Sequence, residues 1–346
     1  MDYISERNIK NLAKIDALLV ELPDFCTEFF IGIENRTTPL TRLNYAHDLR
    51  VFFKFLCEKL HKFSGLSPIE FTLKDLATVD STDIERFLSY TNVYVNEDGE
   101  TRTNSANGKY RKLSSVRSMF KYFYNKDKLP ENVSAKVSTP KLREKEIIRL
   151  NQPEIKRVLN AAEYGTSLSD HAMCFHERDR ARNMAIITLF LGTGIRISEC
   201  VGLDIEDIDF AAKSFTVTRK GGNRVILYFS DEVAAALSWY LEVRNANKKI
   251  PENERAFFVS AQNRRISVRA VENIVKKYAT IATPLKKISP HKLRSTYGTR
   301  LYEETGDIYV VAEVLGHKDV NTTKRHYAAS SENIRKKAAE KVKLYD

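Results

Sequence analysis

Four side chains near the C-terminal end of the chain could together act on a phosphodiester. His317 follows a Leu-Gly pair and precedes Tyr327 by ten residues, and His291 and Arg294 lie shortly upstream. A histidine and an arginine three positions apart share one face of a helix. Arginine and histidine can hold phosphate oxygens, and a tyrosine oxygen can attack phosphorus. The pattern therefore predicts a phosphoryl-transfer site whose remaining parts come from elsewhere in the chain.

Two basic residues in the middle of the chain could supply those parts. Arg196 follows Gly-Thr-Gly at the start of an expected helix, and Lys220 lies in the turn of an expected hairpin. A guanidinium gives a phosphate two hydrogen bonds and stays charged, so Arg196 and Arg294 suit the non-bridging oxygens. Tyrosine has an ordinary pKa of about 10 and needs a base or cationic neighbours, a role open to His291. Lys220 could protonate the departing oxygen, and His317 could donate to the phosphate.

Each of these residues also has a structural interpretation. Arg196 could form a local ion pair with Glu199, one helical turn further on. The hairpin tip, where Arg219 and Arg224 flank Lys220, could merely contact phosphate. His291, which follows Ser-Pro, could have only a structural role at a helix N-terminus, and His317, which follows a glycine, could have only a structural role at a helix C-terminus. The occurrence of the whole set in one chain favours the chemical interpretation.

Length and composition favour a two-domain protein that binds a polyanion. The chain has 346 residues, and 56 Lys and Arg against 45 Asp and Glu give a net charge of +11. The sequence begins with no signal-peptide pattern and contains no apolar run of membrane-spanning length. The four cysteines are scattered without a CxxC pair, which argues against a disulfide framework or a zinc site. We expect a cytoplasmic protein with reduced thiols.

Residues 1–130 are expected to form an all-helical domain. Apolar residues recur at helical spacing from Tyr45 to Leu56 and again from Leu113 to Phe123. Basic residues lie off these stripes and could make sequence-independent contacts with phosphates, although a solvated charged face would have the same pattern. The candidate DNA contacts here are Arg42, Lys109, Arg111, Lys112, Arg117 and Lys121, with Arg219 and Arg224 on the later hairpin.

A second domain is expected after a linker. Residues 131–149 are polar, extended and poor in packing side chains, which is typical of an interdomain linker. Residues 150–346 should form a helical domain that contains one small antiparallel sheet and ends in a C-terminal helix. A turn rich in glycine, which tolerates positive φ, should join the last two strands. The strands are expected at 208–210, 214–218 and 224–229.

The complete set of motifs resembles the tyrosine recombinase family, which includes the phage integrases, the Xer recombinases and the transposon integrases. In chain order, the features that carry the resemblance are Gly-Thr-Gly-x-Arg, the hairpin lysine, His-x-x-Arg, Leu-Gly-His and the later tyrosine. The resemblance implies a SAM-like core-binding domain followed by an α+β catalytic domain. It also implies the catalytic residues, which are Arg196, Lys220, His291, Arg294, His317 and the nucleophile Tyr327, with Glu199 as a supporting acid.

The resemblance further implies an activity. Members of this family break and rejoin double-stranded DNA at specific sites through a covalent 3′-phosphotyrosine link, without a metal or other cofactor. The resemblance implies a tetramer on two duplexes, with the C-terminal helix passed to a neighbouring protomer, in a cytoplasmic, nucleoid-associated protein. It leaves open a need for accessory DNA-bending or directionality factors. Integration, excision, inversion and dimer resolution are equally compatible with the motifs.

Two other functions use similar chemistry or the same fold. A type IB topoisomerase shares the arginine, lysine, histidine and tyrosine chemistry, but the two-domain length and the Xer-like N-terminal helices argue against it. A DNA-binding protein of the same fold that does not cleave is the second alternative. The completeness of the residue set argues against that alternative.

Overall fold

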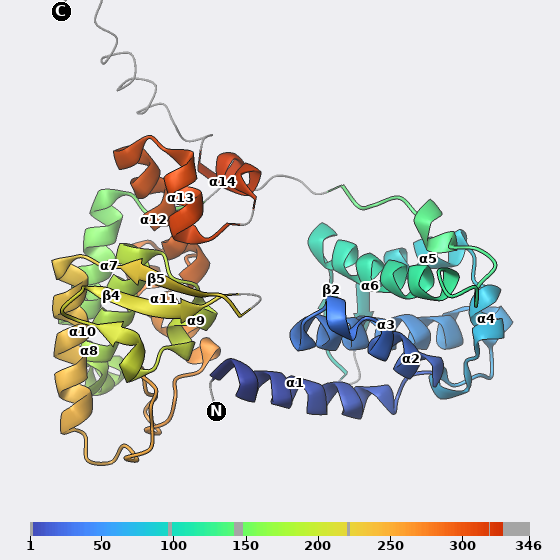
Figure 1. Ribbon diagram of the computed structural model, residues 1–346, viewed down its shortest axis with the longest axis horizontal. Coiled ribbons are helices and arrows are strands. Elements are labelled where there is room, and N and C mark those ends of the chain that lie inside the picture. Colours follow the sequence, from blue (N-terminus) through green and yellow to red (C-terminus); the bar gives the residue numbers. More distant parts are fainter. Residues whose placement is uncertain (1–2, 96–98, 142–147, 220–221, 318, 328–346) are drawn as a thin grey trace, which may run out of the picture. The chain divides into compact units, whose positions relative to one another are not determined.

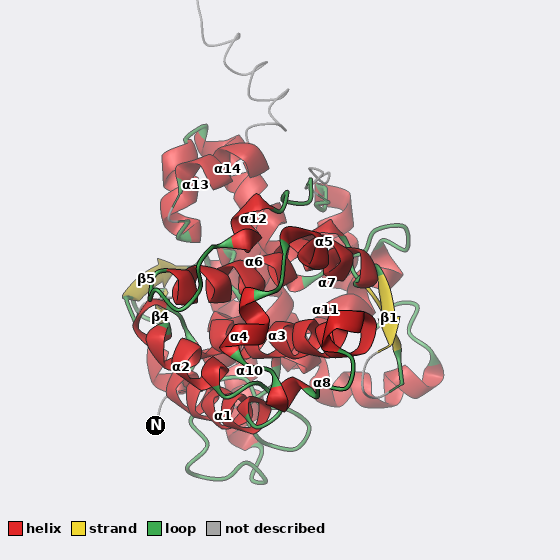
Figure 2. Ribbon diagram, turned by 90° about the vertical axis from the view of Figure 1, so that its right-hand side faces the viewer, coloured by secondary structure: helices red, strands yellow, loops and turns green. Residues whose placement is uncertain are grey.

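The part of the chain that the structure describes is mainly helical, with two small antiparallel sheets (Figures 1 and 2). It divides into two compact units, Met1–Glu144 (unit 1) and Lys145–Asp346 (unit 2). The predicted fold class, mainly α with small antiparallel pairing, is confirmed. Among the described helices, none is long and apolar enough to cross a membrane. The computed structural model describes residues 3–95, 99–141, 148–219, 222–317 and 319–327.

Unit 1 is built around a long central helix, α3, which contacts α1, α5 and α6. The Thr38 hydroxyl accepts a hydrogen bond from the Thr41 N–H at 3.3 Å, and Pro39 occupies the first helical position. A side-chain cap and a proline at this point both suit a helix N-terminus. The helices are α1 (Tyr3–Leu19), α2 (Phe25–Gly32), α3 (Pro39–Lys59), α4 (Leu73–Ala77), α5 (Ser81–Tyr90) and α6 (Ala106–Tyr124).

The core of unit 1 is rich in phenylalanine. Phe52 and Phe87 meet edge to face with 5.0 Å between ring centroids, and Phe53 meets Phe71 in the same way at 5.4 Å. All four rings are buried. Edge-to-face contact suits the quadrupole of aromatic rings, so this core adds defined geometry to apolar burial. The basic residues of α3 and α6 are therefore carried on a well-packed framework.

Unit 1 also contains a hairpin, which corrects the expectation of an all-helical domain. β1 (Val93–Val95) pairs antiparallel with β2 (Thr101–Thr103). β-Branched and aromatic side chains dominate both strands. Gly99, which precedes β2, has a φ of 76°, a conformation that glycine adopts without strain.

Part of the expected linker is packed on unit 1. A 3-10 turn spans Val133–Lys136, and both Ser134 and Val137 are buried. Arg117 of α6 donates to the carbonyl oxygens of Ser134, at 3.2 Å, and of Val137. Unit 1 therefore extends beyond residue 130, while residues 142–147 lie outside the described residues.

Unit 2 combines helices with a three-stranded sheet of order β3-β4-β5. The strands are β3 (Ile208–Asp209), β4 (Ser214–Thr218) and β5 (Arg224–Tyr228), within one residue of their predicted bounds. In Figure 1, α12, α13 and α14 lie together in the orange-to-red part of the unit. The helices are α7 (Gln152–Tyr164), α8 (Asp170–Thr193), α9 (Ile197–Gly202), α10 (Asp231–Ala246), α11 (Val268–Ala282), α12 (Pro290–Thr305), α13 (Ile308–Leu315) and α14 (Val320–Tyr327). The predicted C-terminal helix lies outside the described residues.

Candidate active site

The last turn of α13 brings together three of the candidate residues of unit 2, Arg196, Arg219 and Arg294. Gly316 ends this helix in the left-handed conformation, with φ 62° and ψ 50°. The last carbonyl oxygens of a helix lack partners within it and carry partial negative charge. Here the side chains of three arginines donate to them. The four accepting carbonyls belong to Glu313, Val314, Leu315 and Gly316.

Arg196 reaches this turn from the start of α9. Its Nη2 donates to the carbonyl oxygens of Leu315, at 3.0 Å, and Gly316, at 2.7 Å. Its Nη1 lies 2.7 Å from Glu199 Oε1, and its backbone N–H donates to Glu199 Oε2 at 2.9 Å. Glu199 therefore binds both ends of Arg196 and orients its guanidinium. The Arg196 side chain is 34% exposed, so a bound anion could reach it from solvent.

Arg294 reaches the same turn from α12 and is buried. It donates to the carbonyl oxygens of Gly194 and Leu315, so it shares the Leu315 acceptor with Arg196. His291, three residues earlier on α12, is exposed. The His-x-x-Arg motif thus supplies one group inside the protein and one at its surface.

Gly194 makes the close approach of these segments possible. It ends α8 with φ 61°, and a Cβ at this position would lie 2.5 Å from Tyr297 Cδ1 and 2.8 Å from Leu315 Cδ2. Only glycine combines a left-handed backbone at low energy with this lack of volume. The second glycine of Gly-Thr-Gly is therefore required by the junction of α8, α12 and α13.

We expect Gly194→Ala to destabilise the protein by about 3 kcal/mol, because left-handed strain and the clash with Tyr297 and Leu315 add. Gly306→Ala is the matched control. Gly306 ends α12 with φ 65°, and a Cβ there would meet nothing within 4 Å. The control should lose only about 1 kcal/mol, from backbone strain alone. Urea unfolding of both variants measures the difference, and equal losses would contradict the packing argument.

The structure ties His317 to the helix that ends in Tyr327. His317 Nδ1 lies 2.8 Å from the hydroxyl oxygen of Thr323, which is fully buried in α14. The His317 N–H also donates to the Ala312 carbonyl at 2.9 Å, which continues the end of α13. Tyr327 is the last residue of α14, and its side chain lies outside the described residues, as does Lys220.

Arg219, assigned from the sequence to DNA contact, turns its guanidinium into unit 2. Its Nη2 donates to the Val314 carbonyl at 2.8 Å, and its Nε lies 4.0 Å from Glu199 Oε1. Burial lowers the pKa of this guanidinium, and the neighbouring Arg196 acts in the same direction, while Glu199 opposes them. Its position directly before Lys220 was a sequence signal that it lies near the site.

Comparison with known proteins decides the family. The model of the "Phage integrase family" matches residues 148–333. The chain is 33% identical over 334 residues to the tyrosine recombinase XerC of Caldanaerobacter subterraneus subsp. tengcongensis, covering 94% of this chain and 88% of that relative. The chain belongs to the phage integrase family of tyrosine recombinases. The resemblance read from the motifs is confirmed, and so is the activity of the class, site-specific DNA recombination.

Other relatives extend the similarity across both units. The tyrosine recombinase XerS of Streptococcus agalactiae serotype III is 31% identical over 341 residues, which cover 90% of this chain and 93% of the relative. Among solved structures, the XerH recombinase bound to a palindromic difH substrate aligns with a TM-score of 0.65 at 19% identity, covering 88% of this chain and 81% of that one. The Tn1549 transposon integrase in complex with circular intermediate DNA aligns with a TM-score of 0.63 at 16% identity, covering 92% of this chain and 99% of that one. These two structures share the recombinase fold.

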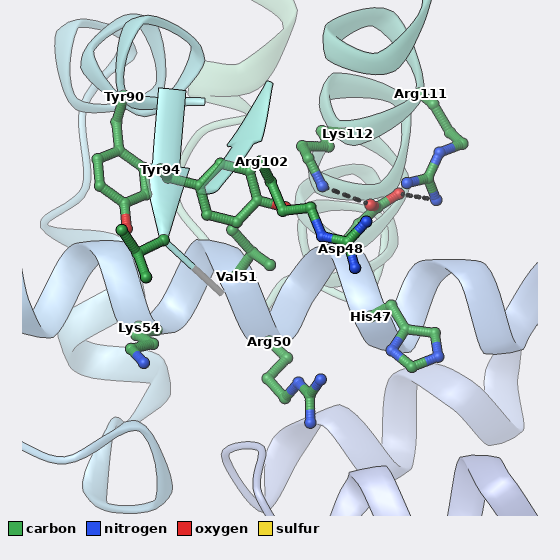
Figure 3. Close-up of a pocket in the computed structure, with 11 residues that line it drawn as sticks. His47, Asp48, Arg50, Val51, Lys54, Tyr90, Tyr94, Arg102, Arg111 and Lys112 are labelled. Atoms are coloured by element: carbon green, nitrogen blue, oxygen red, sulfur yellow. Dashed lines mark hydrogen bonds and ion pairs between the residues drawn. The ribbon is translucent and has the colours of Figure 1, made fainter. Parts of the chain in front are cut away.

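In unit 1 of this recombinase, a buried carboxylate organises the basic residues of α6. Asp48 on α3 is fully buried, and its oxygens lie 3.1 Å from Lys112 Nζ and 2.8 Å from Arg111 Nη1. The Ser115 hydroxyl donates to the same carboxylate at 2.9 Å. Figure 3 shows Lys112 and Arg111 directed at Asp48 from α6, beside a pocket rich in basic side chains. The other basic side chains that line this pocket are His47, Arg50, Lys54 and Arg102.

The remaining candidate DNA contacts differ in exposure. Arg42 is buried and forms an ion pair with Glu34 at 2.6 Å. Lys112 is only 4% exposed, whereas the Arg111 side chain is 45% exposed while bound to Asp48. Arg117 donates hydrogen bonds to the carbonyl oxygens of residues 134 and 137. Lys109 is half-buried, and Lys121 and Arg224 are exposed. The exposed side chains of Arg111, Lys121 and Arg224 are accessible to a large ligand without any change in the packing of either unit.

We expect Asp48→Asn to destabilise the protein by about 3 kcal/mol, because it leaves the buried Lys112 ammonium without a counter-charge. Glu28→Gln is the control, since it removes one partner of the Lys128–Glu28 pair, whose side chains are 42% and 39% exposed. That exposed pair should contribute under about 1 kcal/mol. Urea unfolding compares the two variants, and an Asp48→Asn loss as small as the control's would mean that the buried pair is dispensable.

Proposed function

We propose that this recombinase cleaves DNA with Tyr327 while Arg196 and Arg294 hold the scissile phosphate. One observation carries the proposal: both arginines donate to the carbonyl oxygen of Leu315. Guanidinium groups from α9 and α12 therefore meet at the segment that leads into His317. Two fixed cations beside a histidine suit a phosphorane-like transition state, in which negative charge grows on the non-bridging oxygens.

The chemical step exchanges one phosphodiester for another. The phenolic oxygen of Tyr327 bonds to phosphorus and the bond from phosphorus to the 5′ oxygen breaks, which leaves a 3′-phosphotyrosine. The tyrosine proton passes to a base, for which His291 is the candidate, and Lys220 gives a proton to the 5′ oxygen. Attack by the 5′ hydroxyl of a second duplex reverses the step and joins the exchanged strands. The phosphotyrosine bond conserves the energy, so the residues named here suffice in principle for the exchange.

The other residues act through these groups. Glu199 orients Arg196 through two hydrogen bonds. The bond between His317 and Thr323 fixes the imidazole relative to α14, so that His317 can donate to the phosphate near the helix that carries the nucleophile. These hydrogen bonds hold the Arg196 and His317 side chains in place, and such preorganisation lowers the reorganisation needed for catalysis.

DNA contacts away from the reacting phosphate come from exposed basic residues. We assign phosphate contacts to Lys109, Arg111, Lys121 and Arg224, whose side chains are accessible or partly accessible. Asp48 holds Arg111 in place for this contact. A lysine or arginine that binds one phosphate contributes about one unit to the dependence of log affinity on log salt concentration. The buried or internally bound Arg42, Lys112 and Arg117 support the framework instead.

We assign the active assembly to a tetramer on two duplexes. Exchange of both strands between two sites needs four cleavages, and each chain carries one proposed nucleophile. The apolar stripe in the sequence after residue 328 is a candidate for contact with a neighbouring protomer. Four chains of 39.7 kDa on two duplexes should appear in mass photometry of the assembled complex. A largest complex of two chains on one duplex, under conditions that support exchange, would contradict this assignment. If purified protein exchanges strands only after a cell extract is added, the exchange requires an accessory factor such as a DNA-bending protein.

The decisive experiment traps the covalent intermediate. The DNA that the protein binds is first identified by sequencing. A nick just 3′ of the cleavage site in a duplex of that sequence then lets the short fragment with the new 5′ hydroxyl dissociate after cleavage, so that it cannot rejoin the strand. We expect a covalent complex that survives SDS, with the 3′ end attached and with Tyr327 identified by mass spectrometry of the nucleotide-linked peptide. Absence of any such complex would overturn the proposal. Relaxation of supercoiled plasmids regardless of sequence would instead favour a topoisomerase.

A further inference from the structure

Arg219 stands at the base of the β4–β5 turn. Its backbone N–H donates to the Asn223 carbonyl at 2.8 Å, and its own carbonyl accepts from the Gly222 N–H at 3.0 Å. Both ends of the turn are therefore closed by backbone hydrogen bonds that include Arg219. The residue next in the chain is Lys220, the proposed proton donor.

The side chain of Arg219 anchors this turn to the end of α13. Nη2 donates to the Val314 carbonyl at 2.8 Å and Nη1 to the Glu313 carbonyl at 3.4 Å. The side chain is 13% exposed, and its Nε lies 4.0 Å from the Glu199 carboxylate that also binds Arg196. One guanidinium thus touches the helix end that leads to His317 and the acid that orients Arg196.

Gly316 leaves room for this guanidinium. A Cβ at position 316 would lie 2.0 Å from Arg219 Nη1 and 2.3 Å from Cζ. The glycine of the Leu-Gly-His motif therefore serves two purposes, since its φ of 62° ends α13 and its lack of a side chain admits Arg219. A lysine could not reproduce the contact, because its ammonium is a single point rather than a fork that spans two carbonyls.

We propose that Arg219 is a positioning residue that holds the turn bearing Lys220 against the α13 end and Glu199, and so aligns proton donation with phosphate binding. The inference rests on the proposed role of Lys220. It assigns to Arg219 an effect on the departure of the 5′ oxygen, transmitted through the turn. Arg219 itself touches neither the phosphate nor the leaving group in this scheme.

The leaving group provides the test. In a normal substrate the bond from phosphorus to the 5′ oxygen breaks and that oxygen takes a proton. In a duplex with sulfur in place of the bridging 5′ oxygen, the phosphorus–sulfur bond breaks and the fragment departs as a thiolate, which needs no proton because thiols are far more acidic than alcohols. A defect in proton donation disappears with the sulfur substrate, whereas a defect in phosphate binding persists.

The experiment measures single-turnover cleavage of both substrates at saturating protein. Lys220→Ala should slow cleavage of the oxygen substrate by roughly 10²–10⁴-fold, the usual range for a general acid. Arg219→Ala should slow it by roughly 10–10²-fold, because the donor is misplaced rather than absent. Both variants should cleave the sulfur substrate at nearly the wild-type rate. Arg269→Ala, a change at an arginine 81% exposed on the same unit, should match wild type on both substrates.

The outcomes separate the two levels of the inference. Suppose that the sulfur substrate restores the cleavage rate of Lys220→Ala but not that of Arg219→Ala. The positioning role of Arg219 is then overturned, while the role of Lys220 stands. If Lys220→Ala itself fails to recover, the proton-donor role is wrong and the inference falls with it. If Arg219→Ala does not fold, Arg219→Lys carries the test, with a smaller defect on oxygen and recovery on sulfur. Wild-type cleavage of the oxygen substrate by Arg219→Lys would overturn the need for a guanidinium.

Discussion

Tyr327→Phe is expected to abolish the covalent protein–DNA complex while leaving DNA binding intact. The change removes the single oxygen that would bond to phosphorus and keeps the aromatic ring. Loss of a nucleophile removes the whole covalent pathway, so cleavage should fall by at least roughly 10⁴-fold. The nicked duplex described above measures cleavage on an SDS gel, and fluorescence anisotropy with the same duplex measures binding.

The control for this variant is another tyrosine of unit 2. Tyr309→Phe also removes one phenolic oxygen, from a side chain that is 70% exposed on α13. It should cleave and bind as wild type does. A covalent complex that persists in Tyr327→Phe and disappears in Tyr309→Phe would move the nucleophile to α13 and refute the proposed assignment.

Arg294→Ala is expected to impair both catalysis and stability. Arg294 is 4% exposed and donates to the carbonyls of Gly194 and Leu315, two buried residues. Arg294→Ala leaves the Gly194 carbonyl without its arginine donor, while the Leu315 carbonyl keeps Arg196 as a donor. One buried carbonyl left without a donor costs about 1–3 kcal/mol, so the free energy of unfolding should fall by about that amount. Loss of one fixed cation from a phosphate site should reduce the cleavage rate by roughly 10²–10³-fold.

Two comparisons separate these effects. Arg196→Ala should slow cleavage to a similar degree and destabilise less, since the Arg196 side chain is 34% exposed and water can replace its hydrogen bonds. Val158→Ala truncates a core side chain of α7 that is 1% exposed, so it should destabilise without slowing cleavage by folded protein. Urea unfolding and single-turnover cleavage, both well below the melting temperature, measure the two quantities. Equal cleavage by Arg294→Ala and Val158→Ala would reduce Arg294 to a structural residue.

Local rules accounted for much of the fold. The apolar stripe from Tyr45 to Leu56 predicted a helix, and the structure has α3 from Pro39 to Lys59, with Thr38 as its N-cap and Pro39 in its first turn. The hairpin of unit 2 follows from alternating strands around a glycine-rich turn. The hairpin of unit 1 was missed because its strands have only three residues each, too few for a clear alternation.

The basic residues of unit 1 illustrate where local reasoning ends. Lys112 and Arg117 occupy α6 at positions that a helical pattern leaves outside the apolar stripe. Lys112 instead meets Asp48, 64 residues away in the chain, and Arg117 meets carbonyls up to 20 residues away. Periodicity tells which face a residue occupies, but the partner on that face comes from another element. Long side chains can also bury their stems and carry the charge to a distant acceptor.

For this recombinase, the sequence by itself determined the family, the main helices and the residues that could do chemistry. Helices follow from local periodicity, and the chemical residues follow from residue types in short motifs, so neither needs knowledge of distant contacts. Only the tertiary structure decided how Arg196 and Arg294 are held, since both use the Leu315 carbonyl, 119 and 21 residues away. It also showed that Arg219, a candidate DNA contact in the sequence, donates to two carbonyl oxygens at the end of α13. A backbone carbonyl has the same chemistry at every position, so no sequence pattern marks the one that two arginines from different elements will share.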